Sequence, residues 1–283
     1  MKTIIVPTDF SENADNAAKY AILMSKMHYN KLIFTHVYSL PFLNPEAGMV
    51  YDQSFFDAQR IQADKALREH IEKVYTSLGM HRNLLLSELE VIEAISLAGG
   101  IEKVHHKYQA NLVIMGTHGA TGIKKFFLGS NAVDVIESAA IPVITVPNNC
   151  DFNVIKTVAY CSDFSDIENE LPKVVDFAKA FSAHVNVIHI AKDLATSNNF
   201  EIDPLIKKWQ EINGYDKINL HVVQGADNTN VDEALKALLS ELNVDLLVMF
   251  HQQRNFWKAL FEKSTTAEFV YEWTAPILTM YKK

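Results

Sequence analysis

The sequence predicts an α/β protein of two tandem domains, each an open parallel sheet with helices on both faces. The chain has 283 residues, which is long for one domain and suits two. An internal repeat supports this division, because KTIIVPTDFSEN from Lys2 matches KTVAYCSDFSDI from Lys156. In each copy, short runs of valine, isoleucine and leucine alternate with amphipathic stretches. This alternation is typical of βαβ units around a buried parallel sheet.

The elements of the first copy follow from its apolar spacing. The apolar runs predict strands at 2–7, 31–38, 85–91, 111–115 and 142–146. Apolar residues at helical spacing predict helices at 12–28, 52–78, 99–109 and 130–139. Pro142 begins the last predicted strand, as Pro276 does in the second copy. Since proline cannot donate a ladder hydrogen bond, this position suits an edge strand.

The second copy is a shortened version of the first. The segments that correspond are LIFTHV (32–37) and VNVIHI (185–190), NLVIMG (111–116) and DLLVMF (245–250), and IPVITV (141–146) and APILTM (275–280). Most of the missing length falls between the second and third strands. The polar stretch PNNCDFN (147–153) lacks periodicity and is predicted to be a linker. We therefore expect domains at 1–148 and 154–283.

Composition limits the partners and the compartment. Lys plus Arg number 26 against 34 Asp plus Glu, so the formal charge is −8, and this disfavours attachment to nucleic acid or to anionic membranes. The apolar run in MKTIIVPTDF is too short for a signal peptide, and no run approaches the length of a membrane span. A cytoplasmic location is expected. Cys150 and Cys161 lack the spacing of metal ligands and are expected to be reduced thiols.

A glycine-rich loop follows the predicted strand 111–115 and runs from Gly116 to Gly129. In an open parallel sheet, ligands bind beyond the carboxyl ends of the strands. Glycine lets the backbone approach a ligand closely, and the first N–H groups of a helix can bind a phosphate. Ser130 and Asn131 are predicted to cap the next helix, and Lys124 and Lys125 add positive charge. The loop predicts a phosphate site, although glycines that only form turns remain the alternative.

The spacing Gly116-x2-Gly119-x9-Gly129-Ser130 resembles the nucleotide-binding motif of the universal stress protein family. The segments IIVPTDFS, NLVIMGTHG and IPVITVP are similar to that family as well. The resemblance implies a tandem member with two five-stranded parallel sheets of order 3-2-1-4-5. It also implies the Rossmann-like fold of the adenine nucleotide alpha-hydrolases, with ATP as ligand, with or without Mg²⁺.

The resemblance also assigns roles to individual positions. Asp9 would meet the nucleoside and Val37 would border the adenine. The other positions carried over are Pro7 and Thr8 after the first strand, Met115 and Gly116 on the ribose side, and Thr117, His118, Gly119, Gly129, Ser130 and Asn131 around the phosphates. Each position has a structural alternative. Asp9 could belong to the cap of the helix that begins near Ser11, Val37 and Met115 could be packing residues, and His118 could be solvated. His36 and His189 are expected to be structural rather than catalytic.

The second copy lacks the motif, since Phe250, Gln253 and Lys263 stand where the first has its three glycines. We therefore expect one nucleotide site, in the first copy, and a stress-response protein that acts as a sensor or regulator. No paired carboxylates accompany the loop, so at most slow ATP hydrolysis is expected, and no catalytic or metal residue is assigned. A weak ATP hydrolase and a nucleotide-free structural or interaction protein remain alternatives.

Each copy ends in an apolar strand, PVITVP (142–147) and PILTMY (276–281). The implied strand order leaves both at a sheet edge, and exposed apolar edges are normally paired or covered. This pattern predicts an internal pseudo-dimer through the two last strands, and leaves a further homodimer open.

Overall fold

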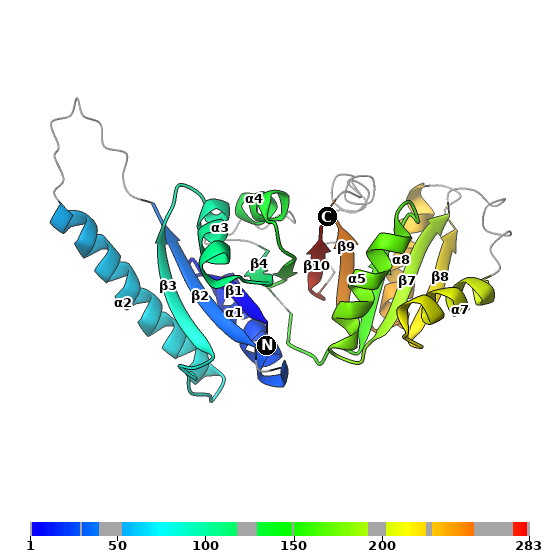
Figure 1. The fold of residues 1–283 in the computed structure, drawn as a ribbon, viewed down its shortest axis with the longest axis horizontal. Helices are drawn as coiled ribbons and strands as arrows, with labels where there is room; N and C mark the ends of the chain where they lie inside the picture. Colours follow the sequence, from blue (N-terminus) through cyan, green and yellow to red (C-terminus); the bar gives the residue numbers. More distant parts are fainter. Residues whose placement is uncertain are drawn as a thin grey trace, which may run out of the picture. The chain divides into compact units, whose positions relative to one another are not determined.

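The computed structural model describes residues 2–28, 30–39, 53–117, 129–148, 150–191, 202–224, 228–251 and 274–281. Its described residues form two compact units, one that ends at Phe152 and one that begins at Asn153 (Figure 1). Each unit is built around a parallel sheet, and each is described here by itself.

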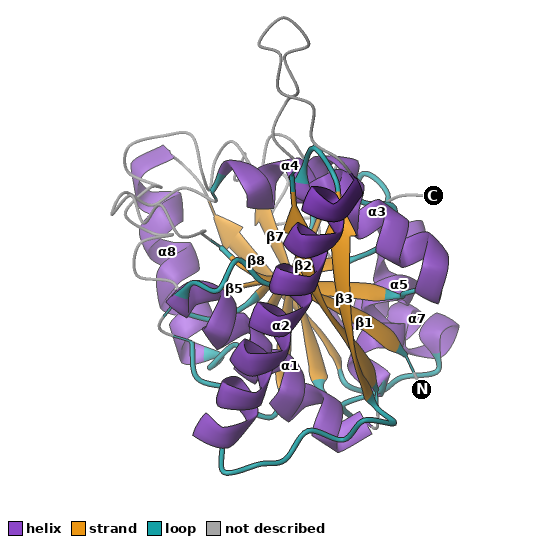
Figure 2. Ribbon diagram, turned by 90° about the vertical axis from the view of Figure 1, so that its left-hand side faces the viewer, coloured by secondary structure: helices purple, strands orange, loops and turns teal. Residues whose placement is uncertain are grey.

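The sheet of the first unit has the order β3-β2-β1-β4-β5, with all neighbours parallel. Its strands are β1 (Thr3–Pro7), β2 (Lys31–Tyr38), β3 (Ser87–Glu93), β4 (Leu112–Gly116) and β5 (Val143–Val146). Its helices are α1 (Glu12–His28), α2 (Gln53–Ser77), α3 (Leu97–Tyr108) and α4 (Ser130–Ser138). Helices α1 and α2 contact each other on one face of the sheet, and α3 and α4 contact each other on the opposite face. Figure 2 shows α2 lying along β2 and β3.

The second unit repeats this order as β8-β7-β6-β9-β10, again with parallel neighbours. Its strands are β6 (Thr157–Cys161), β7 (His184–Ala191), β8 (Ile218–Gln224), β9 (Leu246–Phe250) and β10 (Ile277–Met280). Its described helices are α5 (Ile167–Lys179), α7 (Ile202–Asn213) and α8 (Asn228–Glu241). The predicted order 3-2-1-4-5 is therefore confirmed in both units. Helix α7 has 12 residues where α2 has 25, so the second unit is shorter between its second and third strands, as predicted.

The central strands form the core of each unit. Every residue of β4 and of β9 is buried, which agrees with near-continuous apolar sequences covered on both faces. Both cysteines are free and buried, and burial raises the pKa of the Cys150 thiol to about 12. No described helix is both long and apolar enough to cross a membrane.

The segment predicted as a linker is packed on the first unit. The Asn16 side-chain amide in α1 donates to the carbonyl oxygens of Pro147, at 2.8 Å, and Cys150, at 3.1 Å. The rings of Tyr20 and Phe152 meet edge to face at 5.1 Å. The chain is thus held against α1 as far as Phe152. Local sequence pattern does not predict this contact, because the partners lie far apart along the chain.

Candidate functional site

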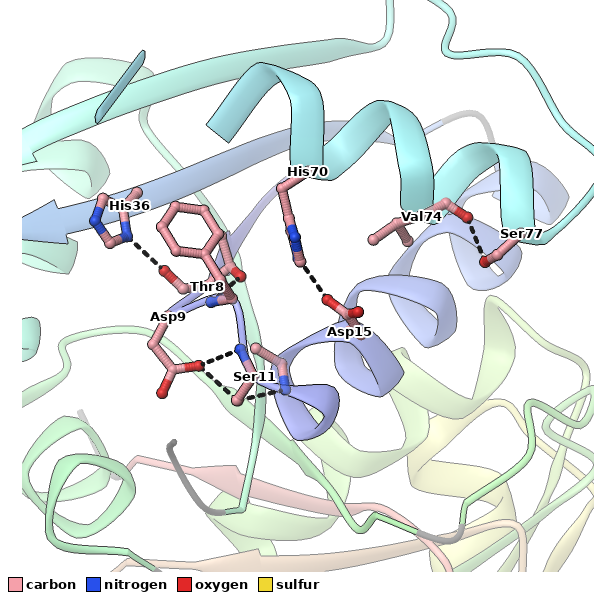
Figure 3. A network of polar contacts seen from close by, with 10 residues as sticks. Thr8, Asp9, Ser11, Asp15, His36, His70, Val74 and Ser77 are labelled. Atoms are coloured by element: carbon pink, nitrogen blue, oxygen red, sulfur yellow. Dashed lines mark hydrogen bonds and ion pairs between the residues drawn. The ribbon is translucent and has the colours of Figure 1, made fainter. Parts of the chain in front are cut away.

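The turn after β1 lies at the carboxyl end of the sheet and is fixed by hydrogen bonds (Figure 3). Thr8 donates its N–H to the Thr35 carbonyl at 2.9 Å, and its hydroxyl oxygen accepts from the Phe10 N–H at 3.0 Å. Phe10 has a left-handed backbone, with φ of 67°, which is costly for a residue with an aromatic side chain. The His36 ring lies 4.4 Å from the Phe10 ring, and its Nδ1 donates to the Thr8 carbonyl at 2.9 Å. His36 therefore has the structural role expected from the sequence.

Asp9 belongs to the start of helix α1. One of its carboxylate oxygens accepts from the Ser11 N–H at 3.1 Å and from the Ser11 hydroxyl at 2.6 Å (Figure 3). The Ser11 hydroxyl oxygen in turn accepts from the Ala14 N–H at 3.2 Å, as an N-cap does. Asp9 thus supports the Ser11 cap, and its contact with a nucleoside stays a prediction. Its side chain is exposed, at the edge where the strands end.

Helix α2 is tied to the same turn. His70 of α2 donates from Nε2 to a carboxylate oxygen of Asp15 in α1 at 2.5 Å, and its ring meets Phe10 edge to face at 5.0 Å. Figure 3 shows this pair beside the Thr8–Ser11 turn. On the side of the sheet covered by α1 and α2, the side chains of His70, Asp15 and Phe10 therefore pack together next to this turn.

Gly116 ends β4 and packs directly on α1. A Cβ atom at this position would lie 2.8 Å from Cγ and 2.9 Å from the backbone oxygen of Asn13. Both distances are well below an ordinary van der Waals contact, so close packing of α1 on β4 requires glycine here. Because side chains alternate along a strand, Met115 faces the opposite side, toward α3 and α4. Met115 is 5% exposed, so it also has the packing role that was its alternative.

Val37 shares that face with Met115. A Cβ atom at Gly100 of α3 would lie 2.4 Å from Val37 Cγ2, so the valine side chain is directed at α3. Val37 is half-buried at the carboxyl end of β2, whereas Pro7 and Thr8 at the end of β1 are buried. Val37 and Met115, assigned to the base and to the ribose side, thus lie on the same face as α3 and α4, whereas a Cβ at Gly116 would point toward α1.

Helix α4 begins at Ser130, as predicted, but its cap differs from the prediction. Gly129 is the N-cap and makes no side-chain cap bond. Ser130 and Asn131 are the first two residues of the helix, and both are exposed. Their prediction as N-caps is therefore wrong. Gly129 donates its N–H to the Thr117 carbonyl at 2.8 Å, and its own carbonyl accepts from the N–H of Ala132 at 2.9 Å. The bond to Thr117 holds the N-cap of the helix beside the residue that follows β4.

This start leaves backbone donors available. Across the described residues, neither the Ser130 nor the Asn131 N–H group has a hydrogen-bond acceptor. Such groups at a helix N-terminus can bind an anion, which the positive end of the helix dipole also attracts. The hydrogen bond between Gly129 and Thr117 keeps these N–H groups close to Thr117, the residue that follows the end of β4. His118, Gly119, Lys124 and Lys125 lie outside the described residues.

The second unit repeats the backbone conformation and several hydrogen bonds of this turn. The Ser162 hydroxyl oxygen accepts from the Phe164 N–H at 3.1 Å, and Phe164 again has a left-handed φ, of 64°. His189 Nδ1 donates to the Ser162 carbonyl at 2.9 Å, and its ring stacks on Phe164 at 4.0 Å. Asp163 accepts from the Ser165 N–H at 2.9 Å. This turn is thus part of the fold, with or without the glycine motif.

The second unit differs where β9 ends. Phe250, at the position of Gly116, is fully buried, and its ring meets Tyr160 at 5.8 Å. The Tyr160 hydroxyl donates to the buried carboxylate of Glu170 and lies 3.1 Å from the Ser162 hydroxyl oxygen. Burial, followed by the bond to Glu170, raises the pKa of Tyr160. Gln253, Lys263, Ser264 and Thr265 lie outside the described residues.

Two close contacts of the site region, those of Gly100 with Val37 and of Asn13 with Gly116, were not predicted from the sequence. The pair Gly99-Gly100 was a usable signal, because glycines inside a predicted helix disfavour it and call for a packing reason. Asn13 carried no signal, since an asparagine near a helix start is common.

Comparison with known proteins agrees with this architecture. The model of the universal stress protein family matches residues 1–147. Over 148 residues the chain is 29% identical to universal stress protein MJ0531 of Methanocaldococcus jannaschii, covering 51% of this chain and 81% of that protein. It is 28% identical over 145 residues to a universal stress protein of Thermus aquaticus, covering 51% of this chain and 98% of that protein.

A solved structure extends the likeness to both units. The crystal structure of a universal stress protein from Archaeoglobus fulgidus covers 99% of this chain and 96% of its own, with 19% sequence identity and a TM-score of 0.65. The fold is therefore shared along the full length of the two proteins.

Proposed function

The chain belongs to the universal stress protein family, and on that basis we propose that its first unit binds one adenine nucleotide, ATP in the first instance, and serves as a cytoplasmic sensor or regulator of the stress response. The observation that carries the proposal is the start of α4. There the N–H groups of Ser130 and Asn131 have no acceptor among the described residues, and the Thr117–Gly129 bond holds them next to the end of β4.

The other parts of the site suit the rest of the ligand. Val37 and Met115 lie on the face shared with α3 and α4, where an apolar surface can support a base and its ribose. The exposed Asp9 carboxylate at the end of β1 can accept a hydrogen bond from a sugar hydroxyl. Mg²⁺, where present, would neutralise phosphate charge. The protein groups bind and orient the nucleotide.

Regulation needs no hydrolysis. A nucleotide shifts a conformational equilibrium whenever it binds two states of the protein with different affinity, and the change in partner affinity follows from that difference. In this proposal hydrolysis is slow or absent.

A nucleotide-free structural or interaction protein is the competing proposal. It is favoured by one observation: Asp9 and Gly116 both have packing or capping roles that require no ligand. Any function for these residues in nucleotide binding is then additional to a structural one.

Titration calorimetry of the full chain with ATP separates the two proposals. We expect a stoichiometry near one per chain, because the second unit lacks the motif. Mass spectrometry of small molecules released on denaturation would show whether a nucleotide is retained from the cell, and a single-turnover assay with Mg²⁺ would measure any hydrolysis. No binding at millimolar ATP, or two equivalent sites, would contradict the proposal.

A further inference from the structure

Two adjacent glycines lie in the first turns of α3, and they differ in what surrounds them. A Cβ atom at Gly99 would meet only the Ser96 hydroxyl oxygen, at 3.4 Å, which is an ordinary contact. A Cβ atom at Gly100 would lie 2.4 Å from Cγ2, 2.9 Å from Cγ1 and 3.3 Å from Cβ of Val37. Gly99 is therefore replaceable, whereas Gly100 is required by the position of Val37.

Val37 cannot avoid such a contact by rotating. Its Cβ is branched, so a change of χ1 exchanges one methyl group for the other, and the Cβ atom itself is already close. Its backbone is held in β2, where it pairs with Ile92 of the neighbouring strand β3. A side chain at position 100 must consequently displace Val37 away from α3 or push α3 off the sheet.

We propose that Gly100 is a positioning residue for the base of the nucleotide: its missing side chain lets Val37 lie back against α3 and so keeps open the space in which a purine fits. The inference rests on the proposed function, because Val37 borders a base only if a nucleotide binds on this face. Gly100 acts through Val37 and does not itself touch the ligand.

In the second unit both aligned positions carry larger residues, but the residue aligned with Gly100 is exposed where Gly100 is buried, so the comparison there is one of sequence only. Continuing the alignment of β4 with β9 back through the preceding helix places Ala234 at the position of Gly100. The left-handed residues that follow the two helices, Gln109 with φ of 50° and Asn243 with φ of 48°, also align. Isoleucine, at position 190, takes the place of Val37. The smaller pair thus occurs in the unit that keeps the glycine motif.

Gly100→Ala in the full chain tests the inference, with Gly99→Ala as the matched control. Both variants add one methyl group to the same helix and raise its intrinsic propensity. Calorimetry with ATP and with UTP should show that Gly100→Ala weakens ATP binding by at least about tenfold, as expected when a carbon is added to an apolar pocket. Binding of UTP, with its smaller base, should fall less, so the ratio of the two affinities drops. Gly99→Ala should leave that ratio unchanged.

The double variant Gly100→Ala/Val37→Ala should recover most of the ratio of Val37→Ala alone, because the clashes with the two Val37 methyl groups are gone and only the 3.3 Å contact with Cβ remains. Circular dichroism and a melting curve establish that each variant is folded. If Gly100→Ala does not fold, Val37→Ile replaces it: the contact with α3 leaves no room on that side, so the added carbon must enter the base space and lower the ratio.

The outcomes separate the two proposals. Wild-type protein that binds no adenine nucleotide overturns both the function and this inference. Wild-type binding together with an unchanged ATP-to-UTP ratio in folded Gly100→Ala, or in Val37→Ile where that variant is used, overturns only the role of Gly100.

Discussion

The two units have the same turn after their first strand but differ at the end of their fourth strand. The turn after the first strand has the same left-handed phenylalanine and the same histidine bond to a backbone carbonyl in both, Phe10 with His36 and Phe164 with His189. One strand away, the first unit has Gly116 where the second has a fully buried phenylalanine. Features common to both units therefore report the architecture, and features of one unit alone are the better guide to ligand binding.

The difference is one of how the first helix is supported. In the first unit the backbone of α1 approaches β4 so closely that no side chain fits between them. In the second unit the corresponding space holds the side chains of Tyr160, Phe250 and Glu170. In the second unit, side-chain packing takes the place of the direct contact that the helix backbone makes with the strand in the first unit.

The largest effect should come from removing that packing. Phe250→Ala is expected to lower the free energy of unfolding of the second unit by about 3–5 kcal/mol, since it leaves a cavity beside Tyr160. All three tryptophans, Trp209, Trp257 and Trp273, lie in the second half, so their fluorescence follows the unfolding of that unit selectively. Phe250→Leu is the control and should cost clearly less. A loss below 1 kcal/mol, roughly the lower edge of core truncations, would mean that the corner is loosely packed.

Importing the second unit's lysine into the glycine loop should have the next largest effect. Gly129→Lys is expected to weaken ATP binding about a hundredfold, or about 2.7 kcal/mol, because the side chain begins where the phosphate must lie. Gly129 has φ of −55° and ψ of 153°, which any residue adopts, so the fold should not change. Calorimetry measures the loss, and Gly129→Ala distinguishes a steric effect from the added charge. Unchanged affinity in folded Gly129→Lys would place the phosphate elsewhere.

A smaller effect is expected at the end of β4. Gly116→Ala should destabilise the first unit by about 1–3 kcal/mol, because its Cβ would force α1 away from the sheet. Far-UV circular dichroism reports both units, so the destabilised transition should appear there at lower denaturant and be absent from the tryptophan signal. An unaltered dichroism curve would show that α1 can yield without cost, and would weaken the contrast between the units.

The sequence was sufficient for the elements that depend on local pattern. The strands of the first unit begin and end within two residues of their predicted bounds, and the strand order implied by the family resemblance is present in both units. What it could not reveal were contacts between residues far apart in the chain. Asn13 against Gly116, Asn16 against Pro147, and the Thr117–Gly129 bond beside the start of α4 are of this kind. The pairing of the two last strands, and the cytoplasmic location, remain predictions.

The buried Phe250 also makes the packing of the second unit hard to convert into that of the first. Glycine there alone would leave a void beside Tyr160, whose hydroxyl donates to Glu170. Substitutions in contact do not add independently, so the glycine becomes acceptable only after Tyr160 and Glu170 have changed as well. Each such step passes through a less stable protein. Converting side-chain packing into direct backbone contact at this place therefore requires several coupled substitutions, and the two halves of the chain cannot exchange their ways of holding the first helix one residue at a time.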